Sequence, residues 1–541
     1  MPTPPAPVID LADLVAEAAR ERPDHLAVVE ADGRSLTWAQ LDAEVTRVAE
    51  GLGAAGLVAG HRVVLALGNR IEFVTSYLGV LRARLVAVPV TPRAVAGELA
   101  RMVADSGARL VVADAEAAET VRQAAELVVR GLDGAPGELD ADLLARATRP
   151  LVVLVGAAPL PGERSYDDLL AAPAGRAPRP APPLQDPERL AVLLYTSGTS
   201  GRPRAAMLTH RALLANIEQM AAVEPAMLHG DDVVLGVLPL FHVYGLNAVL
   251  GGVLRHRAKL VLAEHFDPEG TLDLIEDEAC SVVPLAPAVF ARWRDEEHLA
   301  ERLGPVRLVL SGSAPLDPAL VDDFTARTGL PVHQGYGLTE AAPVVTSTLG
   351  SDEVRRGSVG CALPGIRLRL VDEAGRSPEG TDPGEIEIAG ANLFSGYWPD
   401  GVDGPGVDGW WATGDVGFLD PSGDLFLVDR VKELVIVSGF NVYPVEVEEV
   451  IREVPGVTAA AVIGVADAER GEAVVAYVRA PGADAAEVAD AVRRHCAARL
   501  ARFKQPVRVE VVDELPVTVT GKVQKGRLRG RERRRAQELL G

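Results

Sequence analysis

The chain has 541 residues, of which 48% are hydrophobic and 24% charged, a composition typical of a globular protein too long for one core. Acidic residues outnumber basic ones by 76 − 54 = 22 and only 4% of residues are aromatic, so charge and the scarcity of stacking side chains both disfavour nucleic acid as a partner. The three cysteines, Cys280, Cys361 and Cys496, lie far apart without metal-ligand spacing, which argues against a disulfide framework or a zinc site.

The N-terminal residues contain no basic segment followed by an apolar one, so we expect no secretory signal. No uninterrupted apolar run reaches about 18 residues, the length that a membrane-spanning helix needs. Together with the unpaired cysteines, these features predict a cytoplasmic protein without stable membrane insertion.

The first two hundred residues alternate helical and strand patterns. Apolar residues recur at helical spacing between Leu41 and Leu52. Short apolar runs typical of buried strands lie at 63–67, 85–90, 109–114 and 151–156. The alternation predicts the α/β class. The segment 171–187 is rich in Pro and Ala, and we expect a surface loop there rather than an interdomain linker, because the alternation continues on both sides.

A new α+β pattern begins near residues 429–432. Helical and strand patterns follow at 445–454, 459–465, 473–479 and 485–501. We therefore predict a large N-terminal domain of residues 1–428, a hinge at 429–432 and a small C-terminal domain of residues 433–541. The basic run 525–535 is typical of a solvated helix face.

The clearest motif is an apolar strand that ends in small and hydroxylated residues, LLYTSGTSGRPRAAMLTH at 193–210. Glycine lets backbone N–H groups approach an anion closely, and the hydroxyls between Thr196 and Gly201 can donate to phosphate oxygens. The segment is no Walker A loop, because GxxxxGK[ST] is absent and a strand follows. A simple turn explains the residues equally well, so the motif alone leaves phosphate binding open.

A second motif, HQGYGLTEAAP at 333–343, brings an aromatic ring, a hydroxyl and a carboxylate together. Tyr336 could stack on a flat base, Thr339 could bond a phosphate and Glu340 could hold Mg²⁺. A polar exit from a strand is the alternative interpretation.

Three further segments carry isolated polar candidates. Asp415 lies in GWWATGDVGFLD at 409–420, Arg430 and Lys432 mark the domain break, and Lys522 follows a glycine in LPVTVTGKVQKGRLR at 515–529. Taken singly, Asp415 is better explained by a hairpin turn and Lys522 by a solvated surface lysine.

In this order the five motifs closely resemble the adenylate-forming superfamily of acyl-CoA synthetases, peptide-synthetase adenylation domains and firefly luciferase. The resemblance extends from about residue 9 to residue 530, and further matching segments lie at 238–247, 311–316, 470–478 and 501–506. It implies a large multi-subdomain N-terminal domain with mixed sheets flanked by helices, and a small α+β C-terminal domain that rotates about a hinge. It also implies ATP, Mg²⁺ and coenzyme A as cofactor or co-substrates.

The resemblance implies a role for each matched residue in adenylation. The phosphate loop comprises Thr196, Ser197, Gly198, Thr199, Ser200 and Gly201. The nucleotide and acyl pockets are lined by Gly312, Ser313, Ala314, Gln334, Gly335, Tyr336 and Gly337. Thr339 would touch the α-phosphate, Glu340 would bind Mg²⁺, Asp415 and Arg430 would bind the ribose, and Lys522 would reach the carboxylate and α-phosphate.

For the thioester-forming step, the resemblance implies rotation of the small domain about Lys432. Rotation would withdraw Lys522 and present Ser438 and Gly439 beside the pantetheine arm of coenzyme A. His242 would lie where the acyl pocket meets the thiol channel and would gate thiol entry, although a structural core histidine remains an alternative.

Two departures from the family pattern stand out. The phosphate-loop lysine and the glycine after it are Arg204 and Ala205 here, which preserves the charge but changes its geometry. The stretch 394–411 is shorter and richer in glycine than usual, so we expect a remodelled surface loop there.

The acyl pocket is expected to be mostly apolar and to take a medium- or long-chain fatty acid or an aryl acid. Its candidate residues are Val243, Tyr244, Asn247, Val289, Phe290, Gly335 and Val344. The main alternative is a fatty acyl-AMP ligase that loads an acyl carrier protein; a luciferase-like oxidase and an inactive scaffold are weaker alternatives. The protein could be a monomer or a homodimer.

Overall fold

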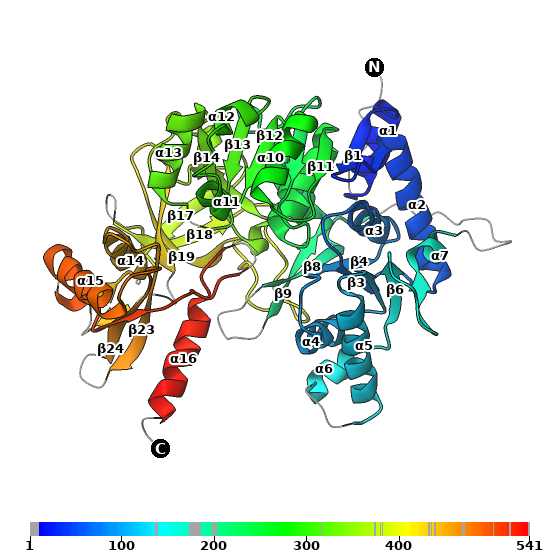
Figure 1. Ribbon diagram of the computed structural model, residues 1–541. Coiled ribbons are helices and arrows are strands. Elements are labelled where there is room, and N and C mark those ends of the chain that lie inside the picture. Colours follow the sequence, from blue (N-terminus) through cyan, green and yellow to red (C-terminus); the bar gives the residue numbers. More distant parts are fainter. Residues whose placement is uncertain are drawn as a thin grey trace.

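The computed structural model describes most of the chain. The described residues are 10–135, 139–171, 185–196, 203–314, 316–372, 375–378, 380, 382–430, 433, 435–437, 440–467, 471–500, 502–518 and 521–538. Within these ranges the chain forms four sheets, three before residue 431 and one after it. Figure 1 shows the first sheet and its helices at the right and the C-terminal sheet at the lower left.

The first sheet has seven strands in the order β7-β6-β5-β3-β4-β8-β9. Its strands are β3 (Arg62–Ala66), β4 (Val86–Pro89), β5 (Leu110–Asp114), β6 (Leu151–Val155), β7 (Arg164–Ser165), β8 (Leu190–Thr196) and β9 (Arg204–Thr209). All pair in parallel except β9, which is antiparallel to β8. The apolar runs of the sequence therefore form these strands as predicted.

Successive residues of the central strands face two different helical layers. In β3, Val63 belongs to the core beneath α2 (Trp38–Ala54) and α3 (Ile71–Arg82), whereas Val64 belongs to the core beneath α4 (Ala96–Ser106) and α5 (Ala118–Leu132). Both faces of the sheet are thus buried, which explains the continuous apolar character of its strands.

The second sheet has nine strands in the order β16-β15-β14-β13-β12-β10-β11-β1-β2. These are β1 (Leu26–Glu30), β2 (Ser35–Thr37), β10 (Val233–Gly236), β11 (Lys259–Leu262), β12 (Val282–Leu285), β13 (Leu308–Ser311), β14 (Val332–Gly337), β15 (Val344–Ser347) and β16 (Cys361–Ala362). One face packs on α8 (His210–Ala221), the π-helix η1 (Tyr244–Gly251) and α9 (Gly252–His256). The other face packs on α10 (Pro268–Asp277), α11 (Pro287–Arg292) and α13 (Pro318–Thr328).

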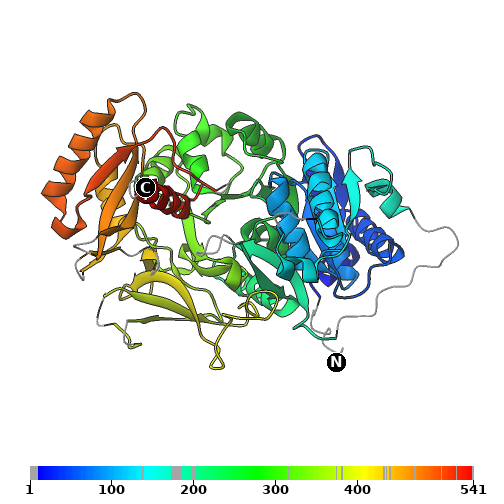
Figure 2. The ribbon, with the colours of Figure 1, turned by 90° about the horizontal axis from the view of Figure 1, so that it is seen from below.

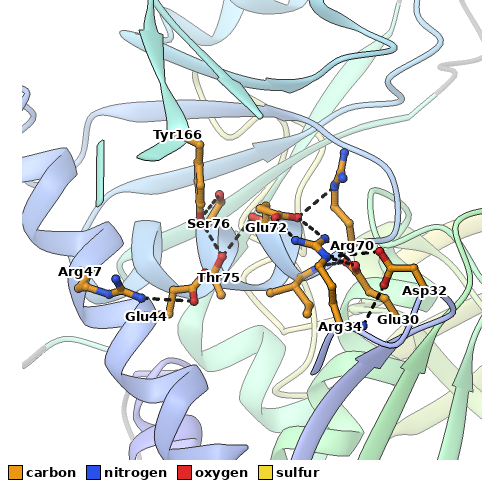
Figure 3. A network of polar contacts seen from close by, with 11 residues as sticks. Glu30, Asp32, Arg34, Glu44, Arg47, Arg70, Glu72, Thr75, Ser76 and Tyr166 are labelled. Atoms are coloured by element: carbon orange, nitrogen blue, oxygen red, sulfur yellow. Dashed lines mark hydrogen bonds and ion pairs between the residues drawn. The ribbon is translucent and has the colours of Figure 1, made fainter. Parts of the chain in front are cut away.

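Polar contacts around α3 connect these two sheets (Figure 3). Arg34, in the turn after β1, donates from Nη1 to Oε1 of Glu72 in α3 at 2.6 Å, and Glu72 also accepts from Arg70 at 3.0 Å. Three residues further along α3, the hydroxyl oxygens of Thr75 and Tyr166 lie 2.7 Å apart. These contacts fix α3 between the sheets.

A four-stranded antiparallel sheet completes the large domain. Its order is β17 (Arg367–Val371), β18 (Gly384–Ala389), β19 (Trp411–Leu419) and β20 (Leu425–Arg430). The last strand ends at the predicted domain break.

The C-terminal domain is built on a long hairpin of β23 (Ala459–Asp467) and β24 (Gly471–Arg479). The sheet is completed by β21 (Val435–Val437), β22 (Phe440–Val442) and β25 (Arg508–Val511). Helices α14 (Pro444–Arg452) and α15 (Ala485–Arg499) cover one face, and α16 (Lys525–Glu538) covers the other; Figure 2 looks along α16. The predicted mixed α/β fold with a small C-terminal domain is confirmed.

The predicted loop 171–187 lies mostly outside the described residues. The basic run at 525–535 forms α16, which exposes Arg527 and buries Leu528 against the hairpin. Lys525 departs from the prediction of a solvated face, because it is buried and forms ion pairs with Glu448 and Glu433. In the described ranges no helix combines the length and the apolar character needed to span a bilayer.

Candidate active site

A cavity of about 1010 Å³ lies where the large domain meets a loop of the C-terminal domain. Its walls come from β9, η1, the ends of β13 and β14 and the start of β19. Thr518, Lys522 and Gln524 contribute from the C-terminal domain. The carboxyl ends of parallel strands are a favoured place for ligands in open α/β sheets, and this cavity follows that rule.

β14 delivers the second sequence motif to the cavity. The Tyr336 hydroxyl donates to Oδ2 of Asp415 in β19 at 2.7 Å, and both residues are buried. A Cβ atom at Gly335 would lie 2.7 Å from the carbonyl oxygen of Thr346, and one at Gly337 would lie 2.3 Å from that of Pro343. The glycines are therefore required by the close approach of β15, and the motif joins two sheets through one buried hydrogen bond.

Glu340 lies on the short 3-10 helix η2 (Thr339–Ala341) at the end of this strand, with 8% of its surface exposed. Its Oε1 accepts a hydrogen bond from the hydroxyl of Tyr397 at 2.6 Å. Thr339, Glu340 and Tyr397 all line the cavity. Nothing in the sequence motifs indicated Tyr397, because it lies 57 residues after Glu340.

Arg204, at the start of β9, contacts the ring of Tyr397 and the carboxylate of Asp403. Its guanidinium carbon lies 3.7 Å from the centre of the Tyr397 ring, and Nη2 donates to Oδ2 of Asp403 at 2.7 Å. Asp403 belongs to the short Gly-rich stretch 394–411. The two departures from the family pattern therefore touch each other. We name the four residues Arg204, Glu340, Tyr397 and Asp403 the polar cluster.

A tight turn of the C-terminal domain carries Lys522. The Thr518 amide donates to the Lys522 carbonyl at 2.8 Å, and the Lys522 amide donates to Oγ1 of Thr518 at 3.1 Å. Gly521 has φ +83°, a left-handed conformation that favours glycine. The turn places Lys522 on the wall of the cavity.

His242 lies close enough to Lys522 to respond to its charge. Burial, and then the positive charge of Lys522, lower the pKa of the His242 imidazole to about 4. Its Nδ1 accepts from the Tyr244 amide at 3.3 Å. The ring is therefore neutral at neutral pH, and its proposed gating role stays a prediction.

Away from the polar cluster the cavity continues as an apolar arm between η1, α8 and the nine-stranded sheet. We define the arm by Ile217, Met220, Ala221, Val234, Ala248, Val249, Val282 and Leu310. Val243, Tyr244 and Val344 also line the cavity, and their role as acyl-pocket residues stays a prediction. Among the described residues, those that define the arm include no Lys or Arg. Burial lowers the pKa of His256 and His333, two further residues of the cavity lining.

Three predicted acyl-pocket residues lie elsewhere. The buried Asn247 amide donates to the carbonyl oxygens of Leu213 and Ala342 at 3.0 and 2.7 Å, so it connects η1 to its neighbours. Val289 and Phe290 pack in the core on the opposite face of the sheet, where the Phe290 ring lies 5.1 Å from that of Phe324. The structure therefore does not bring these three side chains to the cavity wall, and the sequence pattern did not specify which helix face meets the cavity.

Gly312 and Ser313 line the cavity beside Tyr244, and Ser313 has φ +73°. Gln334 lines it as well, whereas Ala314 does not. Thr196 lies on the cavity wall at the end of β8. Arg430 is the backbone partner of Asp415 in the four-stranded sheet. The predictions for Ser197, Gly198, Thr199, Ser200, Gly201, Lys432, Ser438 and Gly439 fall outside the described residues.

Magnesium would need ligands beyond the protein. Among the described residues no group of three His, Cys, Asp or Glu side chains could hold a metal ion. Mg²⁺ characteristically uses one or two carboxylates and completes its shell with substrate phosphates and water. Glu340 fits that requirement, because its carboxylate faces a cavity large enough for a nucleotide.

Comparison with known proteins identifies the family. Residues 15–398 match the family described as AMP-binding enzyme, and residues 446–522 match its C-terminal domain. The chain belongs to the AMP-binding enzyme family. The two matched segments flank the predicted hinge, whose bounds stay a prediction.

Relatives of this AMP-binding enzyme share nearly its full length. It is 34% identical to 4-coumarate–CoA ligase-like 9 of Oryza sativa over 97% of this chain and 94% of the relative. It is 32% identical to the long-chain-fatty-acid–CoA ligase of Bacillus subtilis over 97% and 95%. ATP-bound MatB from Rhodopseudomonas palustris is 33% identical with a TM-score of 0.82 over 96% of this chain and 98% of that one, whereas apo MatB gives 0.72.

Proposed function

We propose that this AMP-binding enzyme activates a medium- or long-chain fatty acid or an aryl acid as its acyl-adenylate and transfers the acyl group to coenzyme A. One observation carries the proposal. A single cavity joins the Tyr336–Asp415 pair, the Glu340 carboxylate and the Lys522 ammonium to an apolar arm. The names of the relatives support an acid–CoA ligase and leave the acid open between the fatty and aryl classes.

The first step would join two anions, and this requirement accounts for the cationic groups. A carboxylate oxygen attacks the α-phosphorus of ATP, the bond to the β-phosphate oxygen breaks, and pyrophosphate leaves. Mg²⁺ held by Glu340 and the nucleotide phosphates would neutralise charge there. Lys522 would stabilise the charge that develops on the carboxylate and α-phosphate oxygens.

The apolar arm supports an acid without a second charge. A carboxylate or ammonium group within the arm would lose its water without gaining an ionic partner among the described residues that define the arm. An extended or flat hydrocarbon would instead replace water against side chains of α8, η1 and the sheet. The apolar arm therefore favours fatty and aryl monocarboxylic acids.

The second step would release AMP when the thiol of coenzyme A attacks the acyl carbon and loses its proton. We propose that the C-terminal domain first rotates about Lys432 and withdraws Lys522. This structure agrees better with ATP-bound MatB, at a TM-score of 0.82, than with apo MatB at 0.72, as expected if enzymes of this family adopt more than one overall arrangement. Three free cysteines support action in a reducing cytoplasm.

The proposal is tested by identifying products from purified enzyme, Mg·ATP and a panel of acids from C4 to C18 plus cinnamates. Mass spectrometry should detect acyl-CoA and AMP with coenzyme A present, and acyl-AMP without it. Acyl transfer to a phosphopantetheinyl carrier protein but never to coenzyme A would replace the proposal by the acyl-AMP ligase alternative. Absence of acyl-AMP with every acid would contradict adenylation itself.

A further inference from the structure

The segment that contains Tyr397 is bonded to both phosphate-facing elements of the cavity. On one side, the Met207 amide donates to the Gly396 carbonyl at 3.1 Å and the Trp398 amide donates to the Ala205 carbonyl at 2.9 Å. On the other side, the Phe394 amide donates to the Glu340 carbonyl at 2.9 Å. The segment therefore connects β9, which follows the phosphate loop, to the turn that carries Glu340.

Neighbouring rings hold the Tyr397 side chain in place. The Phe394 ring lies 5.0 Å from the Tyr397 ring and 5.1 Å from the Trp411 ring, both in edge-to-face arrangements. Aromatic pairs of this geometry resist reorientation. The Tyr397 hydroxyl is consequently directed at Glu340 by packing and not by its hydrogen bond alone.

The hydrogen bond to Glu340 has a direct consequence for the carboxylate. Tyr397 donates to Oε1 at 2.6 Å, which fixes the rotation of the carboxylate and leaves Oε2 and the remaining lone pair of Oε1 for other partners. A ligand that is oriented before the metal arrives loses less conformational entropy on binding. The ring of Tyr397 also stacks on Arg204, whose guanidinium carbon lies 3.7 Å from the ring centre.

We propose that Tyr397 is a positioning residue that couples the magnesium carboxylate to the phosphate-loop cation: its hydroxyl orients Glu340, and its ring together with Asp403 orients Arg204. The inference rests on the proposed function, because it assigns Glu340 to Mg²⁺ and Arg204 to the ATP phosphates.

The arrangement also explains why this chain uses arginine. A planar guanidinium can stack on a ring, donate to Asp403 and still present N–H groups to a phosphate, because it has five donors in a fixed fork. A lysine ammonium at this position would have no flat surface to stack on the ring. The shortened stretch 394–411 brings both of the guanidinium's partners, so the two departures from the family pattern form one unit.

The test compares binding of ATP with Mg²⁺ and of ATP in EDTA by calorimetry, without acid or coenzyme A. Tyr397→Phe keeps the ring and removes the hydroxyl. It should weaken Mg·ATP binding about tenfold, the loss expected for a hydrogen bond to a charged group, and change binding of metal-free ATP less than about twofold. Tyr397→Leu removes the ring as well and should weaken binding of both forms.

Arg204→Lys should weaken both forms of ATP by a similar factor of about five, because the charge remains but its orientation is lost. Tyr166→Phe is the matched control, because it removes a buried phenol hydrogen bond to Thr75 in α3 outside the cavity. It should leave both affinities unchanged.

Equal effects of Tyr397→Phe on ATP with and without Mg²⁺, or no effect on either, would overturn the inference. Circular dichroism and thermal unfolding would show whether Tyr397→Leu folds, and Tyr397→Phe carries the test if it does not. If wild-type protein bound ATP without forming any acyl-adenylate, the proposed function would fail while these affinity ratios could still be measured, so the two failures are distinguishable.

Discussion

The polar cluster and the apolar arm lie in one cavity but are built in opposite ways. Each described side chain of the cluster is fixed by a hydrogen bond or ring contact to a residue far away in the sequence, as in the pairs Tyr397–Glu340 and Arg204–Asp403. The arm is formed by side chains that contact one another without direction, on elements that are also part of the general core. Directed contacts orient reacting groups, whereas undirected packing measures only size and shape, so we expect catalysis to depend on the cluster and acid selectivity on the arm.

The largest expected effect is that of replacing Lys522, the cation that the C-terminal domain contributes to the cavity wall. Lys522→Ala should lower the rate of acyl-adenylate formation about 100- to 1000-fold, because a developing charge loses its preorganised cation. Thioester formation from supplied acyl-AMP should be partly retained. Rapid-quench measurement of each half-reaction checks the difference, and equal loss of both would contradict the assigned role.

The next effect concerns the buried pair behind the nucleotide site. Asp415→Ala leaves the Tyr336 hydroxyl without its 2.7 Å acceptor and removes the proposed ribose ligand. KM for ATP should rise about 10- to 100-fold, the cost of one or two hydrogen bonds to a charged group. KM for the acid should change little, and a shift confined to the acid would place Asp415 at the wrong end of the cavity.

A bulky side chain introduced into the apolar arm tests whether the arm holds the acyl chain of the acid. Ala248→Phe introduces a ring into the apolar arm and should lower kcat/KM about tenfold or more for the longest accepted acid while sparing the shortest. Affinity for Mg·ATP should stay unchanged. A uniform loss over all acid lengths would indicate that η1 had been disturbed and not that the arm measures the acyl chain.

The smallest effect concerns His242, which adjoins Lys522. Because burial and Lys522 lower its folded-state pKa from 6.5 to about 4, the folded protein disfavours protonation, and stability should fall as pH decreases from about 6.5 towards 4. His242→Asn should reduce this fall in urea midpoint. Between pH 6 and 8 the adenylation rate should show no titration step that the variant abolishes, and such a step would mean that the imidazole is charged in the working range.

The parts of the site that are contiguous in sequence could be predicted, and those formed by long-range contacts could not. Tyr336, Thr339 and Glu340 follow one another on a strand and turn, so the motif placed them together. Tyr397 approaches Glu340 because its segment pairs with β9 and because Phe394 bonds the Glu340 carbonyl, and no local pattern indicates either contact. Asn247 shares η1 with true lining residues, but its amide is required by two backbone carbonyls, so face assignment failed where a polar side chain has a structural role.

The fold was more predictable than the site because strands buried on both faces carry continuous apolar runs. The C-terminal pattern likewise identified a separate α+β unit. Lys525 was missed because a lysine in a basic run gives no sign that Glu433 and Glu448 will surround it three residues from Lys522.

The most direct measurement of the central claim is exchange of labelled pyrophosphate into ATP with Mg²⁺ and a fatty or aryl acid, without coenzyme A. If the C-terminal domain supplies Lys522 to a nucleotide held by the large domain, exchange should depend on the acid and should be nearly lost in Lys522→Ala. Exchange that persists in this variant, or that never occurs with any acid in the wild-type enzyme, would contradict the account.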